Sequence, residues 1–347
     1  MSREHLWIRA ETRPTERRAP VVPADTAALV ARGWRVTVEE APTRVFALEE
    51  YRDAGCEVAA TGSWPDAPDD AVILGIKELP ESPRALRHTH VFFAHAFKGQ
   101  AGAAEVLARF AEGGGELLDV EYLTVDGRRV VAFGYWAGYV GAGLGVRAAR
   151  GQLGPVAPGT RADFDATLAG LERPLRALVI GARGRSGQGA CDALRVAGVG
   201  PTRWDVSQTL HLDRAALLEH DLLVNCVASA APGEPFVRTE DLERPGRRLT
   251  TVADVTCDVT SDHNRIPVNT AVTTWAEPVR VVGGDGGSLS VIAIDNLPSL
   301  LPREASIDFS SQLVRHLDDL PGRQGAWAAA RADFDAALAF SPDATGG

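Results

Sequence analysis

A buried strand, a tight turn and a helix are encoded in succession by Leu178-Val-Ile-Gly-Ala-Arg-Gly-Arg-Ser-Gly-Gln-Gly-Ala190. The apolar residues 177–180 predict the strand, and residues 190–196 predict the helix. The turn between them contains Gly181, Gly184 and Gly187. Glycine permits a sharp turn and lets a ligand approach the backbone closely. Backbone amide groups at the start of a helix favour an anion such as a pyrophosphate, so the pattern predicts a phosphate-binding turn.

An acidic residue stands where such a turn would need one. Asp205 follows the predicted strand 202–204, about 20 residues after the glycines, where a dinucleotide site places the acceptor for a ribose hydroxyl. The spacing is G-x-x-G-x-x-G rather than G-x-G-x-x-G, so the glycines alone also fit an ordinary turn beside a solvated aspartate. Strand, helix and acid together favour a dinucleotide site. Nearby Arg203 is the residue expected to weaken discrimination against a ribose 2′-phosphate.

Length and composition limit the function classes. The chain has 347 residues, more than one hydrophobic core usually holds, so two domains are expected. A net charge of −10 argues against a nucleic-acid partner and against an anionic membrane surface. The start of the chain lacks the apolar region of a secretory signal. Four well-separated cysteines fit a reduced, cytoplasmic protein.

The longest uncharged run is 130–146, which approaches the length of a membrane span. Its aromatic residues stand at its centre rather than at its ends, and polar segments flank it. We therefore interpret it as a buried interdomain strand and helix.

Apolar runs alternate with helical segments along both halves of the chain. Strands are predicted at 6–10, 34–38, 57–59, 71–76, 90–94 and 116–118, and again at 178–180, 202–204, 222–227, 250–255 and 291–294. Such alternation predicts an α/β protein with two doubly wound, Rossmann-like parallel sheets.

Two candidate catalytic side chains close neighbouring predicted strands. Lys77 follows the run 71–76, and His95 follows 90–94. Ligands of open α/β sheets bind at the carboxyl ends of strands, and apolar surroundings would perturb the pKa of both groups. Taken singly, Lys77 could be a solvated strand end and His95 a core histidine. Their joint placement favours catalysis.

Charged residues elsewhere are less specific. Four arginines have the planar fork that suits carboxylates, but the residue pattern alone does not choose among Arg17, Arg18, Arg128 and Arg129. His88 and His90 are close in sequence, yet no cysteine or carboxylate spacing makes them metal ligands, so no metal is assigned.

Several motifs resemble one known family, the NAD-dependent, lysine-forming saccharopine dehydrogenases, which are similar in architecture to alanine dehydrogenase. The matching segments are 9–14 (RAETRP), 75–80 (GIKELP), 93–100 (FAHAFKGQ), 127–130 (GRRV), 132–134 (AFG), 180–185 (IGARGR) and 294–305 (IDNLPSLLPREA). The resemblance spans nearly the whole chain.

The resemblance implies a domain division and an activity. It implies a substrate domain from 1–135 plus 303–347, a dinucleotide-binding domain from 136–302, and an active-site cleft between them. It also implies NAD as cofactor, saccharopine, lysine and 2-oxoglutarate as small-molecule partners, and a monomer or small homo-oligomer. Alternatives are a related NAD-dependent dehydrogenase for another amino acid or opine, and an inactive dinucleotide-binding protein.

The resemblance also implies roles for individual residues. Lys77 matches a catalytic base that neutralises an amine, and His95 matches a general base and acid for imine hydrolysis. Two acids that tune them are Glu78 and Glu121. Substrate-binding positions are Arg18, Lys98, Gln100, Arg128 and Phe133. Positions around the dinucleotide are Arg129, Gly181, Gly184, Arg185, Gly187, Asp205, Thr209, Val255, Ile294, Asp295, Asn296 and Leu297.

The chain departs from the family pattern at three places. Ser186 stands where some members have a cysteine able to bridge to the position of Cys226, so Cys226 is expected to be a free thiol. Ala228 replaces an aromatic residue near the adenosine. The connection after Val146 is shorter than expected.

Overall fold

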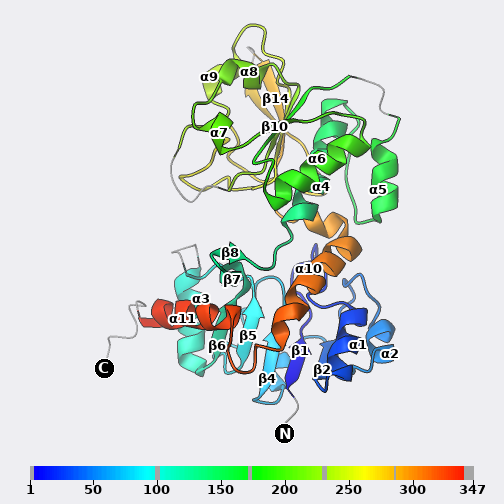
Figure 1. The fold of residues 1–347 in the computed structure, drawn as a ribbon, viewed down its shortest axis with the longest axis vertical. Coiled ribbons are helices and arrows are strands. Elements are labelled where there is room, and N and C mark those ends of the chain that lie inside the picture. Colours follow the sequence, from blue (N-terminus) through cyan, green and yellow to red (C-terminus); the bar gives the residue numbers. More distant parts are fainter. Residues whose placement is uncertain (1–3, 98–101, 171–173, 229–232, 285–286, 340–347) are drawn as a thin grey trace. The chain divides into compact units, whose positions relative to one another are not determined.

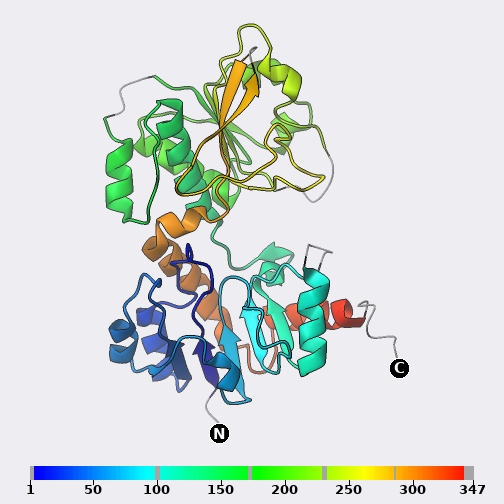
Figure 2. The same ribbon diagram turned by 180° about the vertical axis from the view of Figure 1, so that it is seen from behind.

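The computed structural model describes residues 4–97, 102–170, 174–228, 233–284 and 287–339 (Figure 1; Figure 2). The chain forms two compact units. Unit 1 comprises Met1–Ala132 with Pro302–Gly347, and unit 2 comprises Phe133–Leu301.

Unit 1 is built on a sheet of six parallel strands in the order β3-β2-β1-β4-β5-β6. These are β1 His5–Ile8, β2 Arg35–Glu39, β3 Glu57–Ala59, β4 Ala71–Leu74, β5 Thr89–Phe92 and β6 Glu116–Asp119. The chain runs from β1 outward to β3 and then returns to β4 beside β1. Strands β1 and β4 therefore form the switch point at whose carboxyl edge a doubly wound sheet binds its ligands.

Helices from both ends of the sequence cover this sheet. They are α1 Pro23–Ala31, α2 Leu48–Asp53, α3 Ala103–Gly113, α10 Pro302–Leu317 and α11 Ala326–Ala339, with short turns η1 Trp64–Asp66 and η2 Val120–Tyr122 and a hairpin of β7 Thr124–Val125 and β8 Arg128–Arg129. Phe334 of α11 is buried in one apolar cluster with Trp64, Phe110 and Leu117. The C-terminal helix α11 thus completes the core of unit 1 (Figure 1).

Unit 2 has a second doubly wound sheet, in the order β10-β9-β11-β12-β14-β13. Its strands are β9 Ala177–Ile180, β10 Thr202–Trp204, β11 Leu222–Asn225, β12 Thr251–Asp254, β13 Arg280–Gly284 and β14 Gly287–Ile292. Among the described residues of this sheet, the β13–β14 pair is antiparallel and the other four strand pairs are parallel. The predicted α/β class with two doubly wound sheets is confirmed. The edge strand β13 was not predicted, because two of its five residues are glycines, which are depleted in strands.

The helices of unit 2 include α4 and α6, whose backbones pack directly against each other. They are α4 Gly134–Ala149, α5 Arg161–Leu168, α6 Arg185–Val196, α7 Val206–Thr209, α8 Arg214–Leu218 and α9 Thr239–Leu242, with the turn η3 Leu297–Leu300. A Cβ on Gly138 would lie 1.8 Å from the Ser186 carbonyl oxygen, and one on Gly189 would lie 1.9 Å from that of Tyr135. Glycine at these positions lets the two backbones touch.

This contact corrects the interpretation of the uncharged run 130–146. Its helix belongs to unit 2 rather than lying between domains, and residues 130–133 form no strand. The run is rich in glycine because α4 packs tightly on α6. Within the described ranges, no helix is both long enough and apolar enough to span a bilayer.

The core of unit 1 contains a buried histidine, His90, in β5. Its exposed fraction is 0%, and its ring stands edge-on to Trp64 at 5.0 Å and to Phe110 at 5.4 Å between centroids. Neither ring nitrogen has a hydrogen-bond partner among the described residues. Burial lowers the pKa of His90 well below its usual value, and the charges of Arg9 and His88 lower it further.

We expect the free energy of unfolding to fall as the pH drops below about 6.5, because the unfolded chain then binds a proton that folded His90 does not. The His90 contribution approaches about 1.4 kcal/mol per pH unit between the unfolded and folded pKa values. The His90→Phe variant should lose that part of the slope in urea titrations from pH 7.5 down to pH 5. His5 and His88, whose pKa values burial also lowers, remain in both proteins. The exposed His211→Gln is the control, and an unchanged slope in His90→Phe would contradict the prediction.

Candidate active site

Three side chains with predicted roles follow neighbouring strands of unit 1. Lys77 comes after β4, His95 after β5 and Glu121 after β6, so the structure brings them to one carboxyl edge. Lys77 is half-buried. His95 is exposed, in contrast to the apolar surroundings expected, and its backbone has a φ of 53°. Its ring stacks on Phe93, with centroids 6.3 Å apart.

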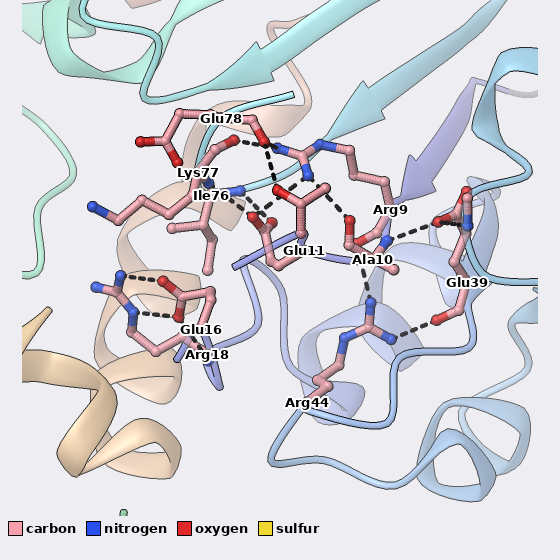
Figure 3. Close-up of polar contacts among 12 residues, drawn as sticks. Arg9, Ala10, Glu11, Glu16, Arg18, Glu39, Arg44, Ile76, Lys77 and Glu78 are labelled. Carbon is pink, nitrogen blue, oxygen red and sulfur yellow. Dashed lines mark hydrogen bonds and ion pairs between the residues drawn. The ribbon is translucent and has the colours of Figure 1, made fainter. Parts of the chain in front are cut away.

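A buried carboxylate, Glu11, holds the backbone in front of Lys77. Glu11 accepts a hydrogen bond from the Ile76 amide at 2.7 Å and one from the Lys77 amide at 2.9 Å (Figure 3). Its side chain is only 6% exposed. Burial raises the pKa of Glu11, and the neighbouring Arg9 charge opposes that shift. The Lys77 side chain extends away from this contact in Figure 3, on the side where Arg18 lies.

Arg9 holds the other side of the Lys77 peptide. Its guanidinium donates to the carbonyl oxygens of Lys77 and Glu78 and lies 3.5 Å from the Glu11 carboxylate. A Cβ on Gly75 would lie 2.4–2.6 Å from the guanidinium atoms. Glycine at position 75 is therefore required for Arg9 to reach this place.

A second buried carboxylate, Asp119, holds the loop that carries His95. Asp119 ends β6 with an exposed fraction of 0%. It accepts hydrogen bonds from the amides of Ala94 at 3.2 Å and Ala96 at 3.3 Å, on either side of His95, and from Glu121 at 2.9 Å. Burial raises the pKa of Asp119, and these hydrogen bonds and His95 oppose the shift.

The two acids expected to tune catalysis are paired with arginines. The Glu121 carboxylate pairs with Arg129 of β8, and the exposed Glu78 carboxylate pairs with Arg13. Arg129, expected at the dinucleotide, is thus placed at Glu121 within unit 1.

The predicted substrate positions of unit 1 differ in their surroundings. Arg18 is buried and forms a two-point pair with Glu16, with nitrogen–oxygen distances of 2.8 and 2.6 Å. Arg128 is exposed on the β7–β8 hairpin. Lys98 and Gln100 lie outside the described residues.

The glycine turn of unit 2 follows β9. At two of its positions the backbone conformation or a close backbone contact requires glycine, whether or not a ligand is bound. Gly181 has a φ of 80°, and a Cβ on Gly187 would lie 2.1 Å from the Gly181 carbonyl oxygen. Gly184 differs, because its φ is −69° and a Cβ there would meet only the Gly181 oxygen at 3.4 Å. The missing side chain of Gly184 leaves open space at the first turn of α6.

Asp205 lies at the start of α7, beside this turn. Its carboxylate is 3.0 Å from the Nε atom of Arg183, a turn residue whose side chain is 83% exposed. Arg203 instead points its guanidinium at the Ala182 carbonyl oxygen, 3.4 Å away. The arginine that contacts Asp205 is therefore Arg183, and the effect of Arg203 on the choice between NAD and NADP stays a prediction.

The remaining predicted positions of unit 2 lie in its helices or directly next to its helices and strands. Arg185 begins α6, Thr209 ends α7, Val255 follows β12, Ile294–Leu297 follow β14 and Phe133 precedes α4. Thr209 donates its hydroxyl to the Asp205 carbonyl oxygen at 3.1 Å. All four cysteines are free, as the serine at 186 led us to expect for Cys226, and burial raises the pKa of the Cys226 thiol.

Four residues with evident roles at these edges were not predicted: Arg9, Glu11, Asp119 and Arg183. Arg9, Glu11 and Arg183 did lie in motifs that match the family, but no separate role was expected for them. For Asp119, the sequence offered one indication, an acid that directly follows the apolar residues of a predicted strand.

The chain is similar to known proteins over most of its length. The alanine dehydrogenase/PNT N-terminal domain family matches residues 7–140. Saccharopine dehydrogenase (NAD(+), L-lysine-forming) of Yarrowia lipolytica is 41% identical over 355 residues, covering 95% of this chain and 96% of that protein. The enzyme of the same name from Candida glabrata is 40% identical over 343 residues, covering 92% of each.

Among solved structures, an L-alanine dehydrogenase superposes with a TM-score of 0.69 over 95% of this chain and 93% of its own. The two sequences are only 16% identical, so this similarity shows a shared α/β fold and no more.

Proposed function

Because this chain belongs to the family of NAD-dependent, L-lysine-forming saccharopine dehydrogenases, we propose that it oxidises saccharopine with NAD to L-lysine and 2-oxoglutarate, reversibly. The observation that carries the proposal is 41% identity over nearly the full length of both chains. The placement of Lys77 and His95 at adjacent strand ends supports it.

The proposed division of labour assigns NAD to unit 2 and the substrate to unit 1. Gly184 supports the first part, since neither its backbone angles nor a neighbouring atom requires glycine there, whereas a pyrophosphate approaching the first turn of α6 would. Asp205 supplies the acceptor for the adenosine ribose hydroxyls. When bound, NAD supplies the acceptor for the hydride of the substrate.

The proposed acid–base roles follow from the chemistry of a secondary amine. The amine nitrogen must be neutral before its carbon can lose a hydride, and Lys77 takes up that proton. His95 then removes a proton from the water that adds to the resulting imine carbon. It returns that proton to the nitrogen and takes up the proton of the hydroxyl group as the C–N bond breaks, giving an amine and a keto acid. Each such proton transfer accelerates a reaction by roughly 10²–10⁴-fold.

The charges of saccharopine match the cations of the motifs. Saccharopine has three carboxylates, and Arg18, Arg128 and Lys98 are proposed to bind them, with Gln100 as a neutral donor. Arginine pairs with carboxylates through two parallel hydrogen bonds, which select geometry as well as charge. A small amino acid such as alanine needs fewer of these contacts.

We expect lysine with 2-oxoglutarate to consume NADH far faster than ammonia with pyruvate. Arg128→Ala should raise the KM for 2-oxoglutarate more than it lowers kcat, because a carboxylate contact persists from the ground state to the transition state. The measurement is NADH absorbance across a panel of amines and keto acids. Arg52→Ala, at an exposed arginine of α2, is the control.

The results with this panel of substrates distinguish the proposed activity from three alternative functions. A preference for ammonia and pyruvate would favour an alanine dehydrogenase-like activity. Turnover of another amine alone would keep the chemistry and change the substrate. Binding of NADH without turnover of any amine would indicate a dinucleotide-binding protein that is not an enzyme.

A further inference from the structure

Beyond the strand ladder at the switch point of unit 1, charged side chains connect the chain after β1 to the chain after β4. The ladder between β1 and β4 pairs Ile8 with Leu74, its last pair. Beyond it, Arg9 and Glu11 contact the chain that continues to Lys77. These contacts lie where a doubly wound sheet presents its ligand-binding edge.

The contacts determine the backbone on both sides of Lys77. Glu11 binds the Ile76 and Lys77 amides, and Arg9 binds the Lys77 and Glu78 carbonyl oxygens. The Ile76 carbonyl oxygen accepts from the Phe93 amide at 3.1 Å. Both backbone groups of Lys77 and the carbonyl oxygen before it are thus hydrogen-bonded, which limits how far the backbone can move and redirect the Lys77 side chain.

Charge makes this arrangement sensitive to small changes. The side chains of Glu11 and Arg9 are only 6% and 1% exposed, so the negative charge of one neutralises the positive charge of the other in a nearly water-free place. A neutral amide at position 11 would leave the Arg9 charge without its counterion and would place an N–H donor against a backbone N–H donor. Leaving buried polar groups unmatched in this way is costly.

We propose that Glu11 and Arg9 are positioning residues for Lys77, which set the direction of its side chain by binding the peptide groups on either side of it. The proposal rests on the proposed function in so far as Lys77 is a catalytic base. Neither residue touches the reacting atoms, so their effect on rate acts through Lys77. A catalytic group displaced by about 1 Å can cost up to about 100-fold in rate.

The test is a double-mutant cycle with an activity-independent readout. Glu11→Gln should lower kcat at least ~10-fold with little change in the dissociation constant of NADH. In the Lys77→Met background, the same substitution should cost less than about 2-fold, because the group that it positions is gone. Hydrogen exchange should also accelerate at least ~10-fold at the Ile76 and Lys77 amides of Glu11→Gln, with or without turnover.

Glu116→Gln is the matched control. Glu116 is a buried acid of the same unit that pairs with Arg323 and Arg331, but it begins β6 at the opposite edge of the sheet. Its replacement should lower the melting temperature while leaving kcat and exchange at 76–77 unchanged. An equal cost of Glu11→Gln in both backgrounds, or unchanged exchange at 76–77, would overturn the proposal. An inactive wild-type enzyme would instead refute the proposed function, and the exchange data would still decide the role of Glu11.

Discussion

Replacing Lys77 with methionine, or His95 with glutamine, is expected to lower kcat at least ~100-fold while leaving NADH binding nearly unchanged. Each substitution removes a proton acceptor at the carboxyl edge of unit 1, whereas Gly184 and Asp205, which are proposed to bind the dinucleotide, lie in unit 2. Steady-state kinetics gives kcat, and NADH fluorescence titration gives the dissociation constant.

The small number of lysines in the chain allows a more specific test of the role of Lys77. Lys77 and Lys98 are the only lysines among 36 basic residues of the sequence, and the remaining positive side chains are arginines. Arginine does not lose its proton in proteins, whereas lysine can. Lys77→Arg should therefore be as inactive as Lys77→Met if Lys77 acts as a base. If charge alone were needed at this position, Lys77→Arg would retain most of the activity.

The few lysines also allow a direct control. Reductive methylation with ¹³C-labelled formaldehyde would label only Lys77, Lys98 and the terminal amine, so the titration of Lys77 can be followed by NMR. His316→Gln serves as the control for His95→Gln. Near wild-type kcat in either Lys77→Met or His95→Gln would refute the assigned acid–base role.

Most strands of the two sheets were predictable because each apolar run was short and bounded by polar residues, although several predicted strands run two residues past the observed carboxyl end, as at 71–76 and 90–94. The positions of Lys77 and His95 at adjacent strand ends followed, since parallel strands place their carboxyl ends at one edge. The exposure of His95 and the positive φ of its backbone did not follow, because nothing in the neighbouring sequence signals either of them.

The side chains that hold these loops were not predictable from local pattern. Glu11 contacts Lys77 across 66 positions, and Asp119 contacts Ala94 across 25. An isolated acid after a strand is consistent with a solvated loop until the strand order is known. The pairing of Asp205 with Arg183 was not predictable for the same reason. It depends on the path that the glycine turn takes in space, which distance along the chain does not show.

This pairing leads to the second prediction, which concerns the choice between NAD and NADP. Wild-type protein should bind NADH in preference to NADPH, because the Asp205 carboxylate accepts from a ribose 2′-hydroxyl and repels a 2′-phosphate. Asp205→Ser should weaken NADH binding and strengthen NADPH binding, each by about 10-fold. This is the order of magnitude of a hydrogen bond to a charged group. Fluorescence titration of both cofactors measures these changes without requiring turnover.

The gain for NADPH in Asp205→Ser should come from Arg183. In the wild-type chain the Nε atom of Arg183 lies 3.0 Å from the Asp205 carboxylate, and removing that carboxylate leaves the guanidinium available to a phosphate at the same place. Adding Arg183→Ala should therefore abolish the gain. Adding Arg203→Ala is the matched comparison and should preserve it, since the Arg203 guanidinium is directed at the Ala182 carbonyl oxygen. Loss of the gain with Arg203→Ala alone would reassign the phosphate contact to Arg203, and wild-type preference for NADPH would overturn the role of Asp205 itself.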